Sequence, residues 1–388
     1  MTMSEALNHK MIIGIDGNEA NSENRVGVNQ YGYELLWALH RLQDEWKNSI
    51  KIIVYLKNQP RADMPPATSH FKYKVLEGRG LWIITKLMPE LIWNREKLDV
   101  VFSLSHYIPP ISRVPRVCTI HDLGYLEFSE QFKRYDFWQL KYWSAYSIFI
   151  SKAIIAVSNS TKTDIVRHYK FASGKISVIY HGYDKTRFNT RINSKDVRRV
   201  LNKYSIVNDY VLYLSTLKPS KNVEGLLEAW KAIKSDFPGI SLVIAGKKGW
   251  LYQNIFDKAQ KLGLKDVIFT DFVPEEDKAP LISGARLFVS PSFWEGFGLD
   301  VLNALACGVP AVVSKVGSLP EVAGEAGVMV DPYDIESIAS GIKKVLSMPE
   351  MEYNTLVTRG LKQAHKFSWE KTARQTLEVL EKVHNGHI

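Results

Sequence analysis

The segment best suited to chemistry is EGFG at residues 295–298, between a strand expected to end at Ser290 and a helix expected to begin near Leu299. Glycines directly before a helix let backbone N–H groups approach an anion, and the helix dipole favours negative charge there. An ionised glutamate only accepts hydrogen bonds, so hydroxyl groups are the natural partners of Glu295. The segment predicts a site for a hydroxylated phosphate ester. The alternative is a tight strand–helix turn with Glu295 as a solvated cap.

The elements around this segment indicate an α/β protein. Short β-branched runs alternate with amphipathic segments, which is typical of βα units and parallel sheets. Strands are expected at 11–15, 51–56, 71–76, 99–103, 116–120, 153–157 and 176–179, and then at 210–214, 240–245, 267–270, 286–289, 310–313 and 327–330. Helices are expected near 30–43, 136–151, 159–169, 222–235, 252–262, 299–306, 335–347 and within 350–384.

The same pattern occurs twice, and the polar stretch 182–194 between the two halves has neither periodicity. We therefore expect one domain over 1–185 and a second over 186–367, with a C-terminal helix near 368–384 that packs back on the first. Two open α/β sheets that face each other form a cleft, and ligands bind at the carboxyl ends of its strands. His121 follows the strand 116–120 at such an edge.

Composition predicts a soluble cytoplasmic protein of two domains. The 388 residues are 45% hydrophobic and 23% charged, and no apolar stretch reaches the roughly 18 residues of a membrane-spanning helix. The first ten residues are polar and resemble no signal sequence. The two cysteines, Cys118 and Cys307, lie among apolar residues and cannot form a disulfide framework.

The net charge of +9 is uneven, because residues 1–190 carry 25 Lys and Arg against 18 Asp and Glu, and the rest carry 25 against 23. A basic first half suits phosphorylated ligands or an anionic membrane surface. Nucleic acid is the weakest candidate, since there is no zinc-finger spacing, RNP-type strand or block of like charges. The alternative is a merely solvated basic surface.

The run PSFWEGFGLDVLNALACGVPAVVS, followed by GSLPEVAGEAGVMVDPYD, resembles the donor-binding signature of glycosyltransferase family 4, whose members are retaining enzymes with the GT-B fold. The likeness extends to VGVNQYGYELLWAL, TIHDLGYLEFSE, ISVIYHGYDKTRF and YLSTLKPSKNVEGLLEAW, and so covers nearly the whole chain. It is greatest for bacterial mannosyltransferase-like enzymes of polysaccharide and O-antigen assembly. It implies two Rossmann-like domains, with the acceptor on the first and a nucleotide sugar on the second.

The resemblance also implies roles for individual residues. Glu295 would contact hydroxyls of the donor sugar, Lys221 the donor phosphates, and His121 the sugar near the reacting carbon, with Asp122 beside it. Gly27 would leave room for the phosphates, and the backbone of Gly296, Phe297, Gly298 and Leu299 would face the donor sugar and diphosphate. The backbone near Val273 and residues 246–249 would contact the base. Lys221 and His121 could otherwise be a surface lysine and a structural histidine. His106 is a further candidate on the acceptor side.

The sequence departs from the family pattern in three places. Asn303 stands where a second glutamate binds the ribose, Ser220 stands where a basic residue precedes the lysine, and Asn29 and Gln30 replace a glycine and a basic residue. Asn303 offers an acceptor without charge, so weaker nucleotide binding is expected. The departures could mean a relaxed donor site, a different nucleotide, or a protein without turnover.

The resulting prediction is a retaining, metal-independent hexosyltransferase without a cofactor, which uses a GDP- or UDP-linked sugar. No Asp-x-Asp metal motif occurs in the sequence. One alternative is an inactive paralogue that binds sugar nucleotides or glycans. A sugar-nucleotide epimerase has less support, because such epimerases lack the EGFG and KPSKN arrangement.

Two segments predict peripheral attachment to the inner face of the membrane. Residues 132–150 and 79–97 interleave aromatic residues with Lys and Arg in the basic half. The alternative is that the four tryptophans of these segments belong to the core, namely Trp82, Trp93, Trp138 and Trp143.

Overall fold

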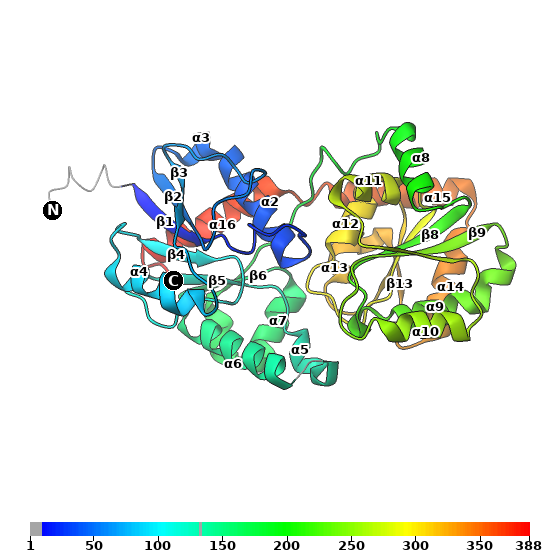
Figure 1. Ribbon diagram of the computed structural model, residues 1–388. Coiled ribbons are helices and arrows are strands. Elements are labelled where there is room, and N and C mark those ends of the chain that lie inside the picture. The colour runs from blue at the N-terminus through cyan, green and yellow to red at the C-terminus, as the bar shows by residue number, and fades with distance from the viewer. Residues whose placement is uncertain (1–9, 132–133) are drawn as a thin grey trace. The chain divides into compact units, whose positions relative to one another are not determined.

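The computed structural model describes residues 10–131 and 134–388. The chain forms two compact units (Figure 1). The first contains most residues before Tyr183 and also Ser368–Ile388, and the second contains Tyr183–Phe367 together with Glu127–Gln131. Apart from the short segment Glu127–Gln131, the chain passes from the first unit to the second at residues 182–183 and returns at 367–368.

The first unit is built on a seven-stranded parallel sheet in the order β3-β2-β1-β4-β5-β6-β7. Its strands are β1 (Met11–Asp16), β2 (Ile50–Leu56), β3 (Phe71–Val75), β4 (Val100–Ser103), β5 (Arg116–Ile120), β6 (Ala153–Ala156) and β7 (Ile176–Val178). Runs such as VVFS and AIIA are buried throughout, as central strands covered on both faces require.

Helices flank this sheet: α2 (Val28–Arg41), α3 (Gln43–Trp46), α4 (Met88–Trp93), α5 (Gly124–Glu127), α6 (Arg134–Ile150), α7 (Asn159–His168) and α16 (Trp369–His384). Ser158 caps α7, because its hydroxyl oxygen accepts a hydrogen bond from the Thr161 amide in the first turn. Ser368 does the same for α16, which packs against α2 (Figure 1).

The second unit has a six-stranded parallel sheet in the order β10-β9-β8-β11-β12-β13. Its strands are β8 (Asp209–Leu214), β9 (Ile240–Ala245), β10 (Val267–Asp271), β11 (Leu287–Ser290), β12 (Ala311–Ser314) and β13 (Gly327–Val330). Its helices are α8 (Ser194–Lys203), α9 (Val223–Ile233), α10 (Gln253–Lys261), α11 (Glu275–Ser283), α12 (Leu299–Ala306), α13 (Leu319–Ala323), α14 (Ile335–Leu346) and α15 (Glu350–Ala364).

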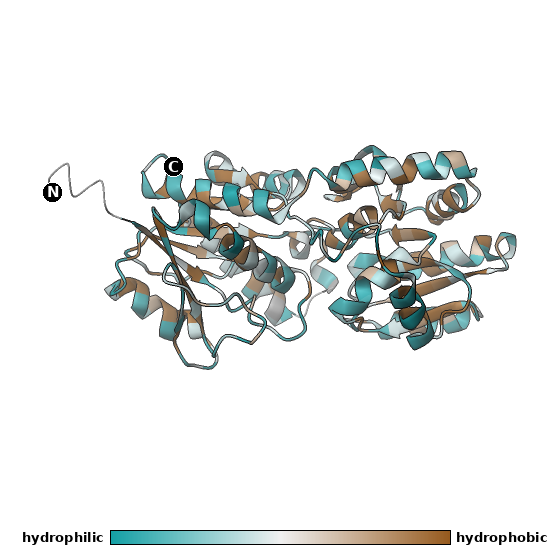
Figure 2. Cartoon of the chain, turned by 90° about the horizontal axis from the view of Figure 1, so that it is seen from above, coloured by the Kyte–Doolittle hydropathy of each residue, from teal (hydrophilic) through white to brown (hydrophobic). Residues whose placement is uncertain are grey.

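The α/β class and the two parallel sheets are confirmed. Figure 2 shows why the strands and helices could be predicted from the sequence. The strands are mostly hydrophobic, and many helices are hydrophobic along one side only. Helices α3, α4, α5, α8, α11 and α13 were not expected from periodicity. Residues 1–9 of the expected first domain and residues 132–133 of the expected aromatic segment lie outside the described residues.

Candidate active site

Strand order explains why two distant motifs of the second unit meet. β8 and β11 are neighbours in the sheet, with Leu287 opposite Val211, although β9 and β10 lie between them in the sequence. The chain direction across the sheet reverses at this pair, and such a switch point is where open α/β sheets bind ligands. The loops that follow β8 and β11, which carry KPSKN and EGFG, leave the sheet at the same edge.

These loops bring Lys221 and Glu295 into direct contact, 74 residues apart in the sequence. The Phe293 amide donates a hydrogen bond to the Ser220 carbonyl over 2.9 Å, which ties the loops together. The Lys221 ammonium then forms an ion pair with Glu295 Oε2. Lys221 is only 7% exposed, so it is not the surface lysine of the alternative interpretation. The residue predicted to bind the donor phosphates, Lys221, and the residue predicted to bind the donor sugar, Glu295, thus lie side by side.

The backbone of Glu295 is fixed as well. Its carbonyl accepts hydrogen bonds from the Ser318 amide at 3.2 Å and the Ser318 hydroxyl at 2.9 Å. Gly317 packs so closely that a Cβ there would lie 2.9 Å from the Glu295 carbonyl oxygen, and its φ of +64° favours glycine. The carboxylate is therefore held in place rather than solvated at a loop tip.

Helix α12 begins at this loop without a side-chain cap. Its N-cap residue is Gly298, whose φ of 99° favours glycine and where a Cβ would lie 2.6 Å from Leu319 Cδ2. The first N–H groups of a helix need external partners, and a glycine cap supplies none from its side chain. The start of α12, at Leu299, can therefore receive an anion beside the Lys221–Glu295 pair.

Asp300, in the first turn of α12, is a site residue that was not predicted from the sequence. Burial raises the pKa of its carboxyl to about 6, and the nearby charges of Glu275 and Glu295 add to this, while Lys278 and Lys221 oppose it. An acid directly after EGFGL was visible in the sequence. Its charge opposes an anion at the helix start, so the site contains a built-in repulsion that depends on protonation.

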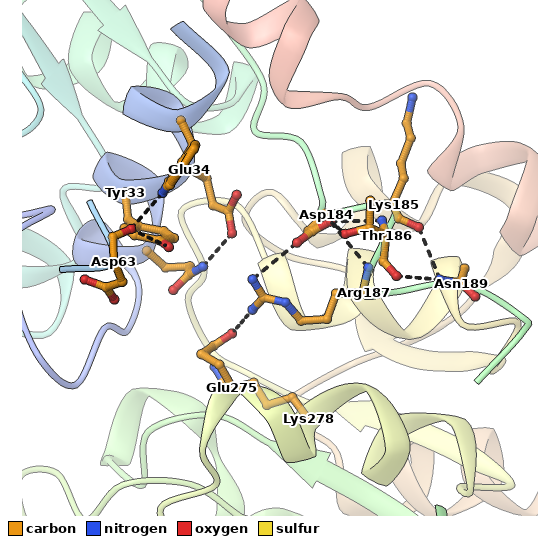
Figure 3. Close-up of polar contacts among 12 residues, drawn as sticks. Tyr33, Glu34, Asp63, Asp184, Lys185, Thr186, Arg187, Asn189, Glu275 and Lys278 are labelled. Atoms are coloured by element: carbon orange, nitrogen blue, oxygen red, sulfur yellow. Dashed lines mark hydrogen bonds and ion pairs between the residues drawn. The ribbon is translucent and has the colours of Figure 1, made fainter. Parts of the chain in front are cut away.

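Glu275 and Lys278, whose charges act on Asp300, belong to a polar network of the second unit (Figure 3). Arg187 donates to Glu275 Oε2 at 2.5 Å and to Asp184 Oδ2 at 3.3 Å, and Lys278 also pairs with Glu275. Asp184 also accepts hydrogen bonds from the Thr186 amide and hydroxyl, so it is fixed in turn. The network holds the charges at the start of α11 that act on Asp300.

The remaining predicted residues of this unit are buried or structural. Asn303 lies on α12 and is almost fully buried, and Val273 is buried just before α11. Ser220 contributes its carbonyl to the loop contact described above. Gly246 approaches the chain so closely that a Cβ would lie 1.8 Å from the Ser215 carbonyl oxygen. None of these positions is in the Lys221–Glu295 pair.

In the first unit, His121 follows β5, and its Nε2 lies 2.8 Å from the Leu104 carbonyl oxygen. A carbonyl only accepts, so Nε2 must donate, and the neutral ring then keeps its lone pair on Nδ1. Asp122 accepts from the Gly124 amide at 2.9 Å and so stabilises the local turn. His121 is thus fixed with Nδ1 as an acceptor that suits a hydroxyl group.

The surroundings of His121 keep it neutral. The Tyr31 ring meets it edge-on at 4.8 Å, and the His181 ring lies 5.8 Å away and stacks on Trp369. Burial lowers the pKa of His121, although the hydrogen bond to the Leu104 carbonyl and the charge of Asp122 oppose this. His181 lies in the segment ISVIYHGYDKTRF but was not predicted as a site residue.

The other candidates of the first unit are His106 and Gly27. Burial and the neighbouring His121 lower the pKa of His106 to about 4, although Asp122 opposes this. Gly27 is the N-cap of α2 with φ 52°, and nothing described lies within 4 Å of a Cβ added there. Its backbone angle therefore favours glycine, and the space beside it is open.

Two family descriptions match the two halves of the chain. Residues 27–187 match the family described as "Glycosyltransferase Family 4", and residues 194–360 match "Glycosyl transferases group 1". The O-antigen chain mannosyltransferase B of Escherichia coli is 31% identical over 293 residues, which span 74% of this chain and 75% of that protein.

Solved structures share the fold. Sucrose-phosphate synthase of Thermosynechococcus elongatus superposes with a TM-score of 0.76 over 97% of this chain and 100% of its own, at 20% identity. The Anabaena protein HepE in complex with UDP-glucose gives 0.71 over 96% and 100%, at 19% identity.

Proposed function

Because this chain belongs to glycosyltransferase family 4, we propose that it is a retaining hexosyltransferase. It moves a sugar from a nucleoside diphosphate to a hydroxyl of a glycan or lipid-linked acceptor, and mannose is the first candidate for that sugar. The observation that carries the proposal is the ion pair between Lys221 and Glu295 at the uncapped start of α12. It combines a cation, backbone donors and a carboxylate, which a diphosphate joined to a sugar requires together.

The residues of the second unit would act on the donor. Lys221 and the amides at the start of α12 stabilise the departing diphosphate, since charge develops there as the bond to the sugar breaks. Glu295 accepts hydrogen bonds from sugar hydroxyls and fixes the orientation of the ring. No resident metal or cofactor is part of this proposal, in keeping with a sequence that lacks Asp-x-Asp.

His121 would hold the donor sugar through Nδ1, which accepts a hydrogen bond from a hydroxyl when Nε2 donates to Leu104. The bond between the anomeric carbon and the phosphate oxygen breaks, and the bond to the acceptor oxygen forms on the same face. The acceptor's proton passes to the leaving phosphate oxygen. The O-antigen mannosyltransferase relative supports polysaccharide biosynthesis as the context, with the reaction in the cytoplasm at the inner face of the membrane.

A panel assay tests the proposal. The protein is incubated with GDP-mannose, GDP-fucose, UDP-glucose and UDP-galactose, each with a set of mannosyl and lipid-linked acceptors, and products are detected by mass spectrometry. We expect transfer from one of these donors, and GDP-mannose is the donor that we expect. Tight binding of a sugar nucleotide with neither transfer nor hydrolysis would support the second candidate, an inactive paralogue, which the uncharged Asn303 favours.

Substitution of Asn303 by glutamate should tighten nucleotide binding. A charged hydrogen bond contributes about 1 kcal/mol more than a neutral one, so affinity for the nucleoside diphosphate should rise about fivefold if the ribose lies at this position. Isothermal titration of wild type and Asn303→Glu with GDP and UDP measures the change. Unchanged affinity for both would place the ribose elsewhere.

Asp300 should make nucleotide binding depend on pH. Because the pKa of its carboxyl is raised to about 6, it is ionised at pH 7.5 and mostly protonated near pH 5. The substitution Asp300→Asn removes this repulsion. At pH 7.5 the variant should therefore bind the diphosphate about fivefold, or roughly 1 kcal/mol, more tightly than wild type. At pH 5 the two proteins should bind it equally.

Titrations of both proteins at the two pH values check this, and the protonation of the nucleotide itself cancels in the comparison. Asp236→Asn, which removes an exposed partner of Lys343, is the control and should change neither value. Equal affinities of Asp300→Asn and wild type at pH 7.5 would show that Asp300 does not face the anion.

A further inference from the structure

Helix α6 exposes a row of aromatic side chains. Tyr135, Trp138, Tyr142, Tyr146 and Phe149 are separated by three or four residues and so lie on one side of the helix, and their exposed fractions range from 41% to 77%. We call these five residues the aromatic row. Within it, Trp138 and Tyr142 stack at 5.4 Å, and Phe149 meets the exposed Phe171 at 5.8 Å.

Helix α6 is apolar on both its inner and its outer side. Phe137, Leu140 and Ile148 pack into the core of the first unit, where Ser144 and Ser147 are also buried, while the aromatic row points outward. A surface helix usually buries its apolar side and exposes its polar one. Contiguous exposed apolar surface is rare in proteins that have no partner and marks an interaction site.

Cations accompany the aromatic row. The Lys141 ammonium lies 5.0 Å from the Trp138 ring. At the other end, Lys175 lies 5.7 Å from the Phe171 ring and donates to the Phe149 carbonyl. Asp136 is the single acid in the sequence of α6, and residues 1–190 carry most of the net positive charge. The partner should therefore be anionic and should accept aromatic rings.

The structure separates the two segments expected to act together. In 79–97, Trp82 is buried and its indole N–H donates to the Leu76 carbonyl, so that segment belongs largely to the core. Trp93 is exposed at the end of α4, and the Arg95 guanidinium lies over its ring. Of the segment 132–150, the described part presents the row, and Trp143 is half-buried behind it.

We propose that the aromatic row docks the protein on an anionic lipid surface, with the rings at headgroup level and Lys141 and Lys175 at the lipid phosphates. Tyrosine and tryptophan suit this depth because each joins an apolar ring to a polar group. None of the described helices is long and apolar enough to cross a bilayer, so this contact would be peripheral. The inference rests on the proposed function, which places the acceptor at a membrane, but its test does not require transfer activity.

Vesicle sedimentation tests the proposal with the full chain. Wild type is mixed with phosphatidylcholine vesicles containing 30% phosphatidylglycerol, or with phosphatidylcholine alone, at 50 and 500 mM NaCl. We expect binding to the anionic vesicles that weakens at high salt, and at least tenfold weaker binding for the variant Trp138→Ser/Tyr142→Ser/Phe149→Ser. Trp93→Ser, which removes an exposed tryptophan outside the row, should bind like wild type.

The variant's circular dichroism and thermal midpoint must match those of wild type, and Lys141→Gln offers a milder second variant that should reduce only the anionic preference. Wild type without anionic preference at low salt would overturn the proposal. So would undiminished binding by the folded triple variant, or a wild-type dimer that the triple variant abolishes while vesicle binding is absent.

Discussion

Glu295→Gln should lower turnover by roughly 10- to 150-fold, the equivalent of the about 1.5–3 kcal/mol that a hydrogen bond to a charged group contributes. Nucleoside diphosphate affinity should change by less than about threefold. The amide keeps the size of the side chain but removes the charge that orients the sugar, and it releases Lys221 from its ion pair to act on the phosphates. Steady-state kinetics and isothermal titration separate the two effects.

The control is Glu228→Gln, which breaks an ion pair with Lys258 elsewhere in the second unit and should leave both quantities unchanged. Equal losses of turnover and of diphosphate affinity in Glu295→Gln would contradict the assignment of Glu295 to the sugar. They would place this carboxylate in nucleotide binding or in the fold of the loop.

Lys221→Met should weaken diphosphate binding by about two orders of magnitude. The change removes a charge-assisted hydrogen bond to the phosphates, and it also leaves the Glu295 carboxylate unpaired beside them. Both effects act in the same direction, so this should be the largest single loss of affinity in the site. Titration with GDP and UDP measures it.

A second substitution keeps this test independent of folding. In Lys221→Met/Glu295→Gln the unpaired carboxylate is gone, so affinity should recover by about fivefold relative to Lys221→Met, and stability should recover with it. Lys343→Met, at an exposed ion pair with Asp236, should bind like wild type. Wild-type affinity in folded Lys221→Met would exclude Lys221 from the phosphate site.

All thirteen strands were predictable, most of them because central strands of a parallel sheet are buried on both faces and appear as short, continuous apolar runs. The edge strand β3, FKYKV, is partly exposed and instead alternates apolar with charged residues. Some helices were not predicted, and the reason differs from one helix to the next. α8 has the helical spacing Val197, Val200 and Leu201, but only Val200 is buried and the rest of the helix is polar or charged, so the segment was not recognised. α11 contains Pro280, opens with three acids and has no apolar side, so its periodicity does not indicate a helix.

The site was predictable residue by residue but not as a geometry. The motifs with Lys221 and Glu295 were recognisable, yet their contact depends on β8 lying beside β11, and strand order is a non-local property. The raised pKa of Asp300 likewise depends on burial and on charges that α11 supplies. The tautomer of His121 follows from the Leu104 carbonyl, 17 residues earlier in the chain.

The measurement that tests the central claim most directly is the anomeric configuration of the product. The protein is incubated with GDP-α-mannose and a mannosyl acceptor that it accepts, and the new linkage is assigned by NMR from the one-bond carbon–hydrogen coupling at the anomeric carbon. Retention predicts an α-linked product, formed at a rate that falls in Glu295→Gln and Lys221→Met. A β-linked product would contradict the proposed mechanism, because it requires inversion at that carbon.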